Sequence, residues 1–500
     1  MEEIQIHPMI LTSLLCLIFL WSIYRMLLKP SSKRKLPPSP PKLPIIGNLH
    51  QLGLLGHQDL HSLSQKHGPL MLLHLGSVPV LIVSSADSAR EITRTHDLSF
   101  ANRPVYKAFK KLVYGCKDVT LSPYGEYWRQ MKSIVVLQVL SSRRVQSFRS
   151  IREEETAVFL NKIQASSGPL DLSTMFANFT NDGIGRAAFG GKYSESENGK
   201  KFLRVMTDLM ELLGTINIGD FIPWLDWIGR VNGFDKRLDQ TAKEMDEVLE
   251  SLIQERLQQT ETRSSKNGED FLDVLLQIYN DESADASIDR DSVKSLLMDV
   301  FVGGTDTIST AMEWAMSELL RHPKVMEKLQ QEVRGIVKEK QDIRDDDLEK
   351  MHYLKAVIKE ALRFHPPLPL LVPRVATKDV QIKGLDISTG TMVMINAWAI
   401  GRDPVSWDEP EKFMPERFLN SSIDFRGLDF ELIPFGAGRR GCPGITFAVV
   451  AMELLLANLV HKFDWKLPKG VDAKDLDMTE SPGLTVHRAT PLLAVASHTT

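Results

Sequence analysis

The feature that most constrains this chain is a loop near its C-terminal end, which places one cysteine among glycines and arginines. Residues 434–444 read Pro-Phe-Gly-Ala-Gly-Arg-Arg-Gly-Cys-Pro-Gly, and an apolar run of helical character over residues 445–463 follows at once. A Cys442 thiolate just before a helix faces the positive end of the helix dipole and its free amide donors. We expect these donors to lower the thiol pKa and to restrain the electron density on sulfur, as a redox-active iron ligand requires.

Other residues of the loop suit a flat, acidic cofactor. Phe435 can shield one face of it, Gly438 and Gly444 allow the backbone to approach it closely, and Arg440 has the charge to bind an acidic group. The loop also fits the dinucleotide-binding fingerprint through Gly436, Gly438 and Gly441. That match is weak by itself, because no βαβ pattern surrounds it.

The spacing Phe-x-x-Gly-x-Arg-x-Cys-x-Gly resembles the haem-binding signature of the cytochrome P450 family; it is filled by Phe435, Gly438, Arg440, Cys442 and Gly444. The resemblance covers essentially the whole chain after the N-terminal apolar segment. Segments such as residues 395–404 are similar to plant microsomal members of specialised metabolism, the group that includes psoralen synthase. The resemblance implies a mainly α fold with small β-sheets, haem b held by Cys442 as axial iron ligand, and Arg440 beside a haem propionate.

Composition excludes several other classes of protein. The 500 residues are 43% hydrophobic and 25% charged, which is ordinary for a globular chain, and the net charge of -4 does not suggest a nucleic-acid partner. Three cysteines cannot build a disulfide framework or a four-cysteine zinc site. We therefore expect the folded part to lie in a reducing compartment, with Cys116 as a buried, inert thiol.

The N-terminal segment predicts a membrane anchor. Residues 9–28 are apolar except for Arg25, long enough to span a bilayer, and basic residues follow in 29–35. The alternative is a cleaved signal peptide, but the apolar run is longer than usual and the basic charge follows it. We expect an anchor over 1–28, a basic, proline-rich hinge over 29–47 and a cytosolic catalytic domain over 48–500. The resemblance implies a single-pass protein of the endoplasmic reticulum membrane.

Residues 70–83 predict a small hairpin, and the pattern is mostly helical from Ala86 onward. Trp128 and Lys132 stand at positions i and i+4 of a helix and share a face. The resemblance makes both of them haem-propionate contacts, although the family usually has arginine at the second position, so the role of Lys132 is an open point. The alternative is a core tryptophan with a surface lysine.

Residues 291–320 predict a long amphipathic helix whose middle reads Gly303-Gly304-Thr305-Asp306-Thr307. Glycines inside a helix are costly and indicate close approach or local distortion. The run resembles the family's oxygen-activation motif, which implies that Thr307 stabilises activated oxygen and that Asp306 feeds a proton relay. Ile308 departs from the usual second hydroxyl residue. The alternative is a helix kink with a capping aspartate.

Glu360 and Arg363 lie at i and i+3 of a helix, and Arg417 follows some fifty residues later. Alone, the first two suggest a solvated surface pair. Together the three resemble the family's buried Glu–Arg–Arg triad, which serves folding and haem incorporation.

The proline-rich stretch 365–374 cannot remain helical, and we expect it to run extended. The resemblance places Arg374 at a propionate there, while the Cys442 motif argues against His365 as an iron ligand. The composition of residues 202–227 is typical of core, whereas the resemblance implies that they roof the pocket. Residues 481–486 are expected to form a hairpin tip that enters it. The expected substrate pocket is apolar and comprises Phe109, Val113, Val300, Phe301, Gly303, Leu371 and Leu484.

These features predict a haem-thiolate monooxygenase that acts on a small hydrophobic plant metabolite such as a terpenoid, coumarin or alkaloid. It would use O2 and electrons from NADPH through a cytochrome P450 reductase, for whose docking exposed cations near the cysteine, Arg439 among them, are candidates. Two alternatives stay open: an oxygen-independent isomerase or dehydratase on the same fold, and a non-catalytic haem- or lipid-binding membrane protein.

Overall fold

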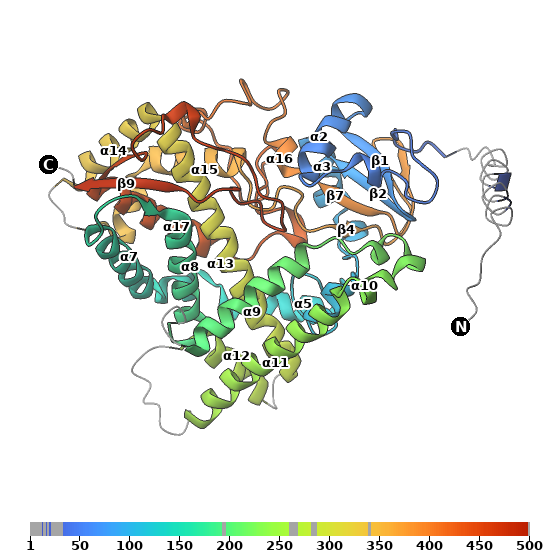
Figure 1. The fold of residues 1–500 in the computed structure, drawn as a ribbon, viewed down its shortest axis with the longest axis horizontal. Helices are drawn as coiled ribbons and strands as arrows, with labels where there is room; N and C mark the ends of the chain where they lie inside the picture. The colour runs from blue at the N-terminus through green and yellow to red at the C-terminus, as the bar shows by residue number, and fades with distance from the viewer. Residues whose placement is uncertain are drawn as a thin grey trace, which may run out of the picture.

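The computed structural model describes residues 34–192, 197–259, 269–281, 288–338 and 342–498, together with residues 13, 17, 20 and 21. It is mainly helical with small sheets, as the sequence predicts (Figure 1). Apart from those four residues, the expected anchor over 1–28 lies outside the described residues, as do residues 29–33 of the hinge.

α-Helices are the main regular elements of the described chain. Their bounds are α2 Gly56–His67, α3 Ala86–Arg90, α4 Lys107–Leu112, α5 Glu126–Ile134, α6 Ser142–Ser147, α7 Arg149–Gln164, α8 Leu172–Phe189, α9 Glu197–Gly214, α10 Ile228–Val231, α11 Phe234–Gln259, α12 Phe271–Asn280, α13 Arg290–Arg321, α14 Pro323–Val337, α15 His352–Phe364, α16 Ala397–Ile400 and α17 Ile445–Lys462.

Three small sheets flank the helices. The first has the order β1-β2-β7-β4 and combines Leu70–Leu75, Val78–Val83, Met392–Ile395 and Arg374–Val375; β2 and β7 pair in parallel, with Val80 opposite Met392. The second joins β3 (Leu170–Asp171), β9 (Leu493–His498) and β8 (Phe463–Lys466). The third is the hairpin of β5 (Val380–Ile382) and β6 (Leu385–Ile387). The predicted hairpin over 70–83 is confirmed as β1 and β2.

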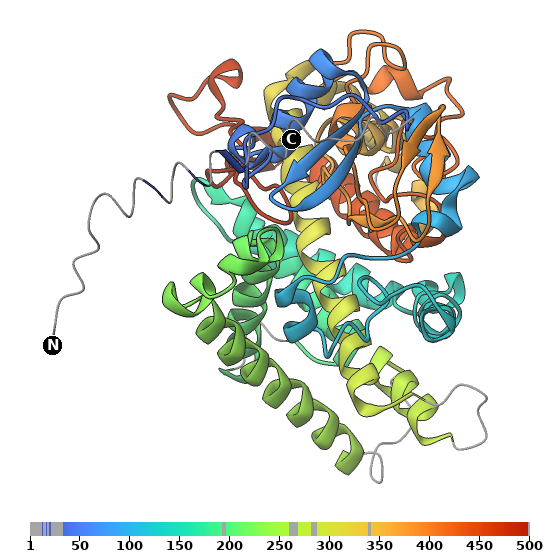
Figure 2. The same cartoon turned by 90° about the vertical axis from the view of Figure 1, so that its right-hand side faces the viewer.

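Helix α13 runs through the middle of the helical part and is visible along its length in Figure 2. It begins after Asp289, whose carboxylate accepts from the Ser292 N–H as an N-cap. It ends at Arg321, because the residue before Pro323 disfavours helical backbone. Every residue from Ile308 to Leu320 is buried, and most of the apolar ones among them belong to the main hydrophobic core.

Helix α17 lies directly after the cysteine loop and is largely buried in the same core. Among the described residues it is the one helix long and apolar enough to cross a membrane, but its burial against α7, α14 and α15 makes it a core helix. The expected helix over 445–463 ends one residue earlier, because Phe463 begins strand β8.

The described part of the proline-rich hinge is extended and docked on the domain. The carbonyl of Pro38 accepts from the Leu72 N–H of β1 at 2.8 Å, and the Asn48 side chain donates to the Pro41 carbonyl at 3.2 Å. The C-terminal hairpin expected over 481–486 is present, closed by a bridge between Glu480 and Arg488.

Candidate active site

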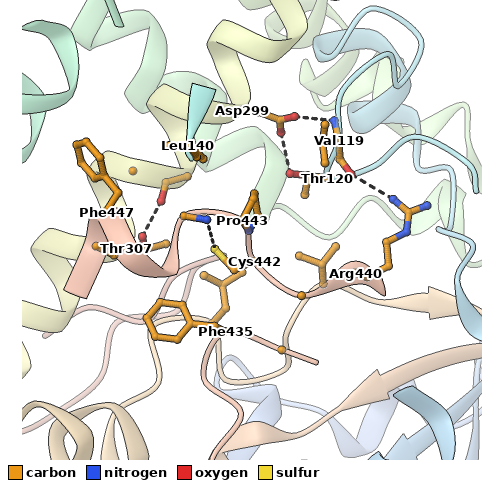
Figure 3. Close-up of a pocket in the computed structure, with 18 of the residues that line it drawn as sticks. Val119, Thr120, Leu140, Asp299, Thr307, Phe435, Arg440, Cys442, Pro443 and Phe447 are labelled. Atoms are coloured by element: carbon orange, nitrogen blue, oxygen red, sulfur yellow. Dashed lines mark hydrogen bonds between the residues drawn. The ribbon is translucent and has the colours of Figure 1, made fainter. Parts of the chain in front are cut away.

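The Cys442 loop is held in shape by its own backbone. The Cys442 N–H donates to the carbonyl of Phe435 at 3.0 Å, and the Gly444 N–H points at the Cys442 sulfur at 3.3 Å. Gly444 is the residue that caps the start of α17. The loop therefore presents the sulfur at the positive end of a helix, with an amide donor on it, as the sequence indicated (Figure 3).

The net effect on the thiol pKa differs from the expectation. Burial raises the pKa of the Cys442 thiol, and this outweighs the Gly444 N–H and the positive charge of Lys132, which both lower it. The donors expected to lower the thiol pKa are thus present, but the protein packed around the sulfur, which is exposed toward the cavity, has the larger effect.

Cys442 lines a cavity of about 260 Å³. Its walls come from α5, α13, α17, the segment 119–120 and the extended stretch 367–374. Most of the lining is apolar, and it includes Val300, Ile308, Ala311, Leu371, Val372 and Phe447. An apolar cavity that exposes one sulfur suits a hydrophobic ligand bound next to a thiolate-held cofactor.

Three arginines reach the same cavity and are almost fully buried: Arg103, Arg374 and Arg440. Arg374 donates to Asp97 at 3.1 Å and to the Ala437 carbonyl. Arg440 donates to the carbonyls of Ala101, Val119 and Ser122.

Arg103 was not predicted and donates only to carbonyls of the described chain, those of Thr120, Val372 and Pro373. Burial, followed by the charges of Arg374 and Arg440, lowers the pKa of Arg103. Burial likewise lowers the pKa of Arg440 to about 10, with Arg374 acting in the same direction. This part of the wall therefore carries buried positive charge in excess of its carboxylates, which a bound anionic group would balance.

Trp128 and Lys132 both line the cavity from α5, as their i,i+4 spacing predicts. The Trp128 indole N–H donates to the Val119 carbonyl at 2.9 Å, and the Arg440 guanidinium lies 4.4 Å from the ring centre. Lys132 donates to the Gly441 carbonyl at 2.9 Å and is largely buried, so it is not a surface lysine. The indole N–H therefore already has an acceptor within the protein, and Lys132 stabilises the cysteine loop itself.

The loop glycines have different roles. Gly438 does not line the cavity: its backbone is left-handed, with φ of +69°, and an added Cβ would overlap the carbonyl oxygen of Thr93. The expectation that Gly438 admits the cofactor is therefore wrong, and its absent side chain instead allows the loop to pack on residues 91–97. Gly444 does line the cavity, and so does Phe435, whose ring packs edge-on against Phe425.

The central residues of α13 divide between two faces of the helix. Thr307, Gly303 and Gly304 line the cavity, and the Thr307 hydroxyl donates to the Gly303 carbonyl at 2.6 Å. An added Cβ on Gly304 would lie 2.6 Å from Ile184 of α8, whereas one on Gly303 would meet nothing within 4 Å. Gly304 thus permits close helix packing, and Gly303 leaves space beside Thr307.

Asp306 does not line the cavity, although it neighbours Thr307 in sequence. Its carboxylate turns to the C-terminal hairpin, where Oδ1 lies 3.0 Å from Nε2 of His487 and Oδ2 accepts from the Thr485 hydroxyl. Burial acts to raise the pKa of Asp306, but the hydrogen bond and charge of His487 outweigh it, so the pKa lies below its ordinary value.

The structure brings Glu360, Arg363 and Arg417 together away from the cavity. Arg363 donates to both carboxylate oxygens of Glu360 at 2.7 and 2.8 Å, and Arg417 donates to Glu360 at 3.1 Å. Glu360 and Arg363 have fully buried side chains, so the surface-pair alternative is excluded. Arg363 also donates to the carbonyls of Gly401 and Pro410, which ties the triad to the loops that follow α15.

Of the seven predicted pocket residues, Val300, Gly303 and Leu371 line the cavity. The other four do not: Phe109 and Val113 are core residues, Phe301 packs against Phe202 with ring centres 4.6 Å apart, and the Leu484 backbone packs at Gly214. The prediction was wrong for these four.

Sequence reasoning missed Val119, Thr120 and Asp299, which the structure places together in the wall. Asp299 accepts from the Val119 N–H at 2.6 Å and from the Thr120 hydroxyl at 2.7 Å (Figure 3). The signal for Asp299 was present, because it lies one helical turn before Gly303 and two turns before Thr307. His365 stacks on Trp314, lies 2.7 Å from Glu318 and does not line the cavity.

The residues present fit haem b. One part of the cavity wall presents the Cys442 sulfur, which accepts from an amide N–H. Another part carries buried arginines that outnumber the carboxylates able to balance their charge. A flat, apolar ring with an iron at its centre and two carboxylates at its edge meets both requirements. Cys442 would hold the iron, and Arg103, Arg374, Arg440 and Lys132 would balance the carboxylates.

Comparisons with known proteins agree with this chemistry. The family model for Cytochrome P450 matches residues 37–495. Cytochrome P450 71A8 of Mentha piperita is 56% identical over 99% of this chain and 97% of that protein, and the tabersonine/lochnericine 19-hydroxylase of Catharanthus roseus is 51% identical over 94% of each.

A solved zebrafish cytochrome P450 with abiraterone superposes with a TM-score of 0.75 at 26% identity, covering 89% of this chain and all of that one. Both the sequence and the fold around the Cys442 cavity therefore match those of cytochromes P450. The chain belongs to the cytochrome P450 family, as a plant monooxygenase of the group that serves specialised metabolism.

Proposed function

We propose that this monooxygenase inserts one oxygen atom from O2 into a C–H bond of a small hydrophobic plant metabolite, such as a terpenoid, coumarin or alkaloid. The observation that carries the proposal is that the Cys442 sulfur and the Thr307 hydroxyl line one largely apolar cavity. Bound haem supplies the activation of dioxygen, because a thiolate ligand favours cleavage of the O–O bond.

The side chains around the cavity divide the remaining work. Arg103, Arg374 and Arg440 hold acidic groups of the cofactor, and Thr307 presents a hydroxyl toward the reacting centre. Asp306 is the acid that supplies protons, and this requires its carboxylate to rotate from the C-terminal hairpin toward Thr307. The apolar wall excludes water, which keeps proton supply under the control of these residues.

The proposed substrate class is based on the residues that line the cavity and on the name of one relative. Ile308 and Leu371 contribute aliphatic surface beside Thr307, so the cavity suits a compact hydrophobic skeleton. The hydroxylase of Catharanthus roseus is named for tabersonine and lochnericine, which makes alkaloids of that size a sensible part of a test panel.

A substrate panel in microsomes with reductase and NADPH tests the proposal. The panel would contain tabersonine, simple coumarins and monoterpenes, and the reaction would run under isotopically heavy O2. The expected result is one heavy oxygen atom in the product. Product without oxygen consumption would instead indicate an isomerase or dehydratase, and tight ligand binding without any turnover across the panel would indicate a non-catalytic binding protein.

We also propose that residues 1–28 anchor the protein in the endoplasmic reticulum, with residues 29–47 as the hinge and 48–500 as the cytosolic catalytic domain. An exposed apolar surface supports this placement; it comprises Leu43, Ile45, Ile216, Trp224, Trp227 and Val231. The parts of this surface at residues 43–45 and 216–231 are linked by the Gly76–Ser77 turn. The Gly76 N–H donates to the Ile46 carbonyl, and the Ser77 N–H donates to the Phe221 carbonyl. Deletion of residues 1–28 should release the protein from the membrane only when Trp224 and Trp227 are also replaced by serine.

The electron donor is proposed to be an NADPH-cytochrome P450 reductase that docks beside the cysteine loop. Arg439 lies in that loop, its side chain is 45% exposed, and it donates to Asp97 at 2.9 Å. Arg439→Glu should raise the reductase concentration needed for half-maximal turnover. The matched control is Arg237→Glu on α11, because Arg237 is 50% exposed and also has a carboxylate partner, Glu211.

A further inference from the structure

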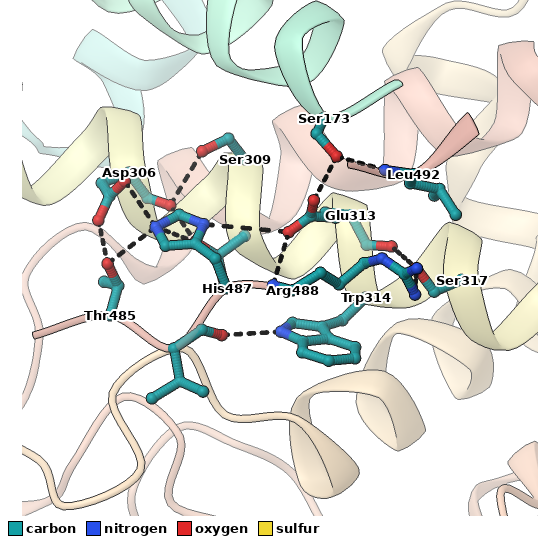
Figure 4. Close-up of polar contacts among 12 residues, drawn as sticks. Ser173, Asp306, Ser309, Glu313, Trp314, Ser317, Thr485, His487, Arg488 and Leu492 are labelled. Atoms are coloured by element: carbon teal, nitrogen blue, oxygen red, sulfur yellow. Dashed lines mark hydrogen bonds and ion pairs between the residues drawn. The ribbon is translucent and has the colours of Figure 1, made fainter. Parts of the chain in front are cut away.

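The C-terminal hairpin brings a histidine against the acid of α13. His487 Nε2 lies 3.0 Å from Oδ1 of Asp306, and the Thr485 hydroxyl, from the same hairpin, donates to Oδ2 (Figure 4). Asp306 faces this hairpin and not the cavity, while its neighbour Thr307 faces the cavity. The acid of the proposed acid–alcohol pair is therefore held by residues about 180 positions later in the chain.

Both ring nitrogens of His487 have polar partners. Nδ1 lies 2.9 Å from the Thr310 hydroxyl, which itself donates to the Asp306 carbonyl at 2.7 Å and can therefore accept from Nδ1. Nε2 lies 3.0 Å from the Asp306 carboxylate, which accepts only, and 3.1 Å from the Thr485 hydroxyl. This arrangement suits a ring with a proton on each nitrogen, which carries a positive charge.

The charged surroundings of the ring agree with this state. On α13 the ring faces two carboxylates, Asp306 at 3.0 Å and Glu313 at 3.9 Å. Glu313 is in turn held by the Ser173 hydroxyl of α8 and the Arg488 N–H of the hairpin. Burial acts to lower the pKa of His487, but the hydrogen bond and charge of Asp306 and the charge of Glu313 raise it above the ordinary value.

The His487 ring is more exposed to solvent than the Asp306 carboxylate. The His487 side chain is 37% exposed, Asp306 is 25% exposed, and Glu313 is only 6% exposed. His487 therefore connects the carboxylate next to Thr307 with bulk water on the side of α13 that the cavity does not reach.

We propose that His487 is the positioning residue of Asp306 and the solvent end of its proton supply. The inference rests on the proposed role of Asp306. The ring holds the carboxylate ionised against the hairpin; it then transfers the Nε2 proton to Oδ1, which leaves a neutral imidazole and a carboxylic acid free to turn toward Thr307. The imidazole regains a proton from water at its exposed edge, so no electrons and no further reactant are needed.

The hairpin has other attachments, which keep it in place without the histidine. The Trp314 indole N–H donates to the Val486 carbonyl at 2.8 Å, the Arg488 guanidinium donates to Ser317 at 3.2 Å, and the Leu492 N–H donates to Ser173 at 2.8 Å. Substitution of His487 should therefore leave the fold intact, which allows its chemical role to be measured.

The first test is the pH profile of NADPH oxidation by the full-length protein with reductase and no added substrate, in ordinary and heavy water. His487→Gln should slow this reaction at least about fivefold, a modest part of the roughly 100-fold or more that positioned proton transfer contributes. It should also enlarge the solvent isotope effect and remove the fall in rate that follows deprotonation of the ring at alkaline pH. His487→Lys should restore the rate and shift that fall to higher pH, because lysine keeps its proton longer.

His322→Gln is the matched control. His322 ends the same helix, has a side chain 36% exposed, and pairs with Glu318 at 3.2 Å, yet it lies away from Asp306. It should leave the rate, the pH profile and the isotope effect unchanged. A His487→Gln variant that also leaves all three unchanged, while Asp306→Asn impairs them, would overturn the inference and leave the proposed function standing.

The second test does not depend on turnover. The ring of His487 can be titrated by NMR of the isotope-labelled histidines and assigned from the His487→Gln spectrum. Asp306→Asn should lower the pKa of His487, and Glu313→Gln should lower it less because of the longer distance. An unchanged His487 titration in Asp306→Asn would overturn the inference. An Asp306→Asn variant with normal rate and isotope effect would contradict the proposed role of Asp306 itself.

Discussion

The ammonium of Lys132 donates a 2.9 Å hydrogen bond to the carbonyl of Gly441, the residue that precedes Cys442. This contact joins α5 to the loop that presents the sulfur, and it places a positive charge beside that sulfur. Lysine therefore stabilises the cysteine loop directly, where the resemblance implied a haem-propionate contact and the alternative was a surface lysine.

Lys132→Met should weaken haem retention. A charged donor to a carbonyl contributes about 1.5–3 kcal/mol, so haem loss should rise by roughly 10- to 100-fold. Lys132→Arg can still reach the carbonyl and should retain most of the haem. The measurement is the rate of haem transfer to an acceptor globin, with Arg129→Gln on the exposed face of the same helix as control. Equal retention in Lys132→Met and Arg129→Gln would show that this contact does not support the loop.

Gly438→Ala should destabilise the protein more than an ordinary substitution at a left-handed glycine. A left-handed backbone costs a non-glycine residue about 1–2 kcal/mol, and overlap with the Thr93 carbonyl adds to it, by about 1–3 kcal/mol for overpacking. Gly390→Ala is the matched control, because Gly390 has φ of +78° and nothing within 4 Å of an added Cβ. The two variants would be compared by urea unfolding, and equal losses would contradict the packing role of Gly438.

Glu360→Gln should prevent stable folding or haem incorporation. It leaves Arg363 and Arg417 without their buried counter-ion, and breaking a buried pair costs about 3–5 kcal/mol. Lys412→Ala breaks an exposed i,i+3 pair with Glu409 and should cost less than about 1 kcal/mol. The yield of folded protein and the moles of haem bound per mole of that protein would distinguish the two variants. A Glu360→Gln variant as stable as Lys412→Ala would refute the structural role.

Thr307→Ala should separate electron consumption from product formation. Without the cavity hydroxyl, proton delivery is no longer directed, so product should fall roughly tenfold or more while NADPH is still oxidised and hydrogen peroxide accumulates. Thr307→Ser should keep most of the coupling. Thr305→Ala is the control on the same helix, since Thr305 makes the same kind of bond to the carbonyl four residues earlier but does not line the cavity. Equal peroxide yields from Thr305→Ala and Thr307→Ala would contradict this role.

Local pattern was enough to predict several elements of the fold and the motif residues of the site. The hairpin over 70–83 and the helix over 291–320 have strong periodicity, and the structure places them at Leu70–Val83 and Arg290–Arg321. Cys442, Thr307 and Arg440 stand in motifs with fixed spacing, and all three line one cavity.

The remaining contacts depend on tertiary packing that no local pattern encodes. Arg103 lies in an irregular segment without a motif, and His487 meets Asp306 only because the C-terminal hairpin folds back on α13. Helix periodicity alone does not separate Asp306 from Thr307, because other adjacent pairs on α13, such as Gly303 with Gly304 and Thr307 with Ile308, both line the cavity. Phe301 was misplaced because its ring packs against Phe202 of α9, a tertiary contact, while Val300 lines the cavity.

The carbon monoxide difference spectrum of the reduced protein tests the central claim most directly. Wild type and Cys442→Ala would be compared, with Cys116→Ala as a control for loss of the other described thiol in the domain. The account predicts a strongly red-shifted Soret band in wild type and Cys116→Ala that is lost in Cys442→Ala. An unshifted, histidine-like band in folded wild type would contradict Cys442 as the iron ligand, and with it the oxygenase chemistry assigned to this cavity.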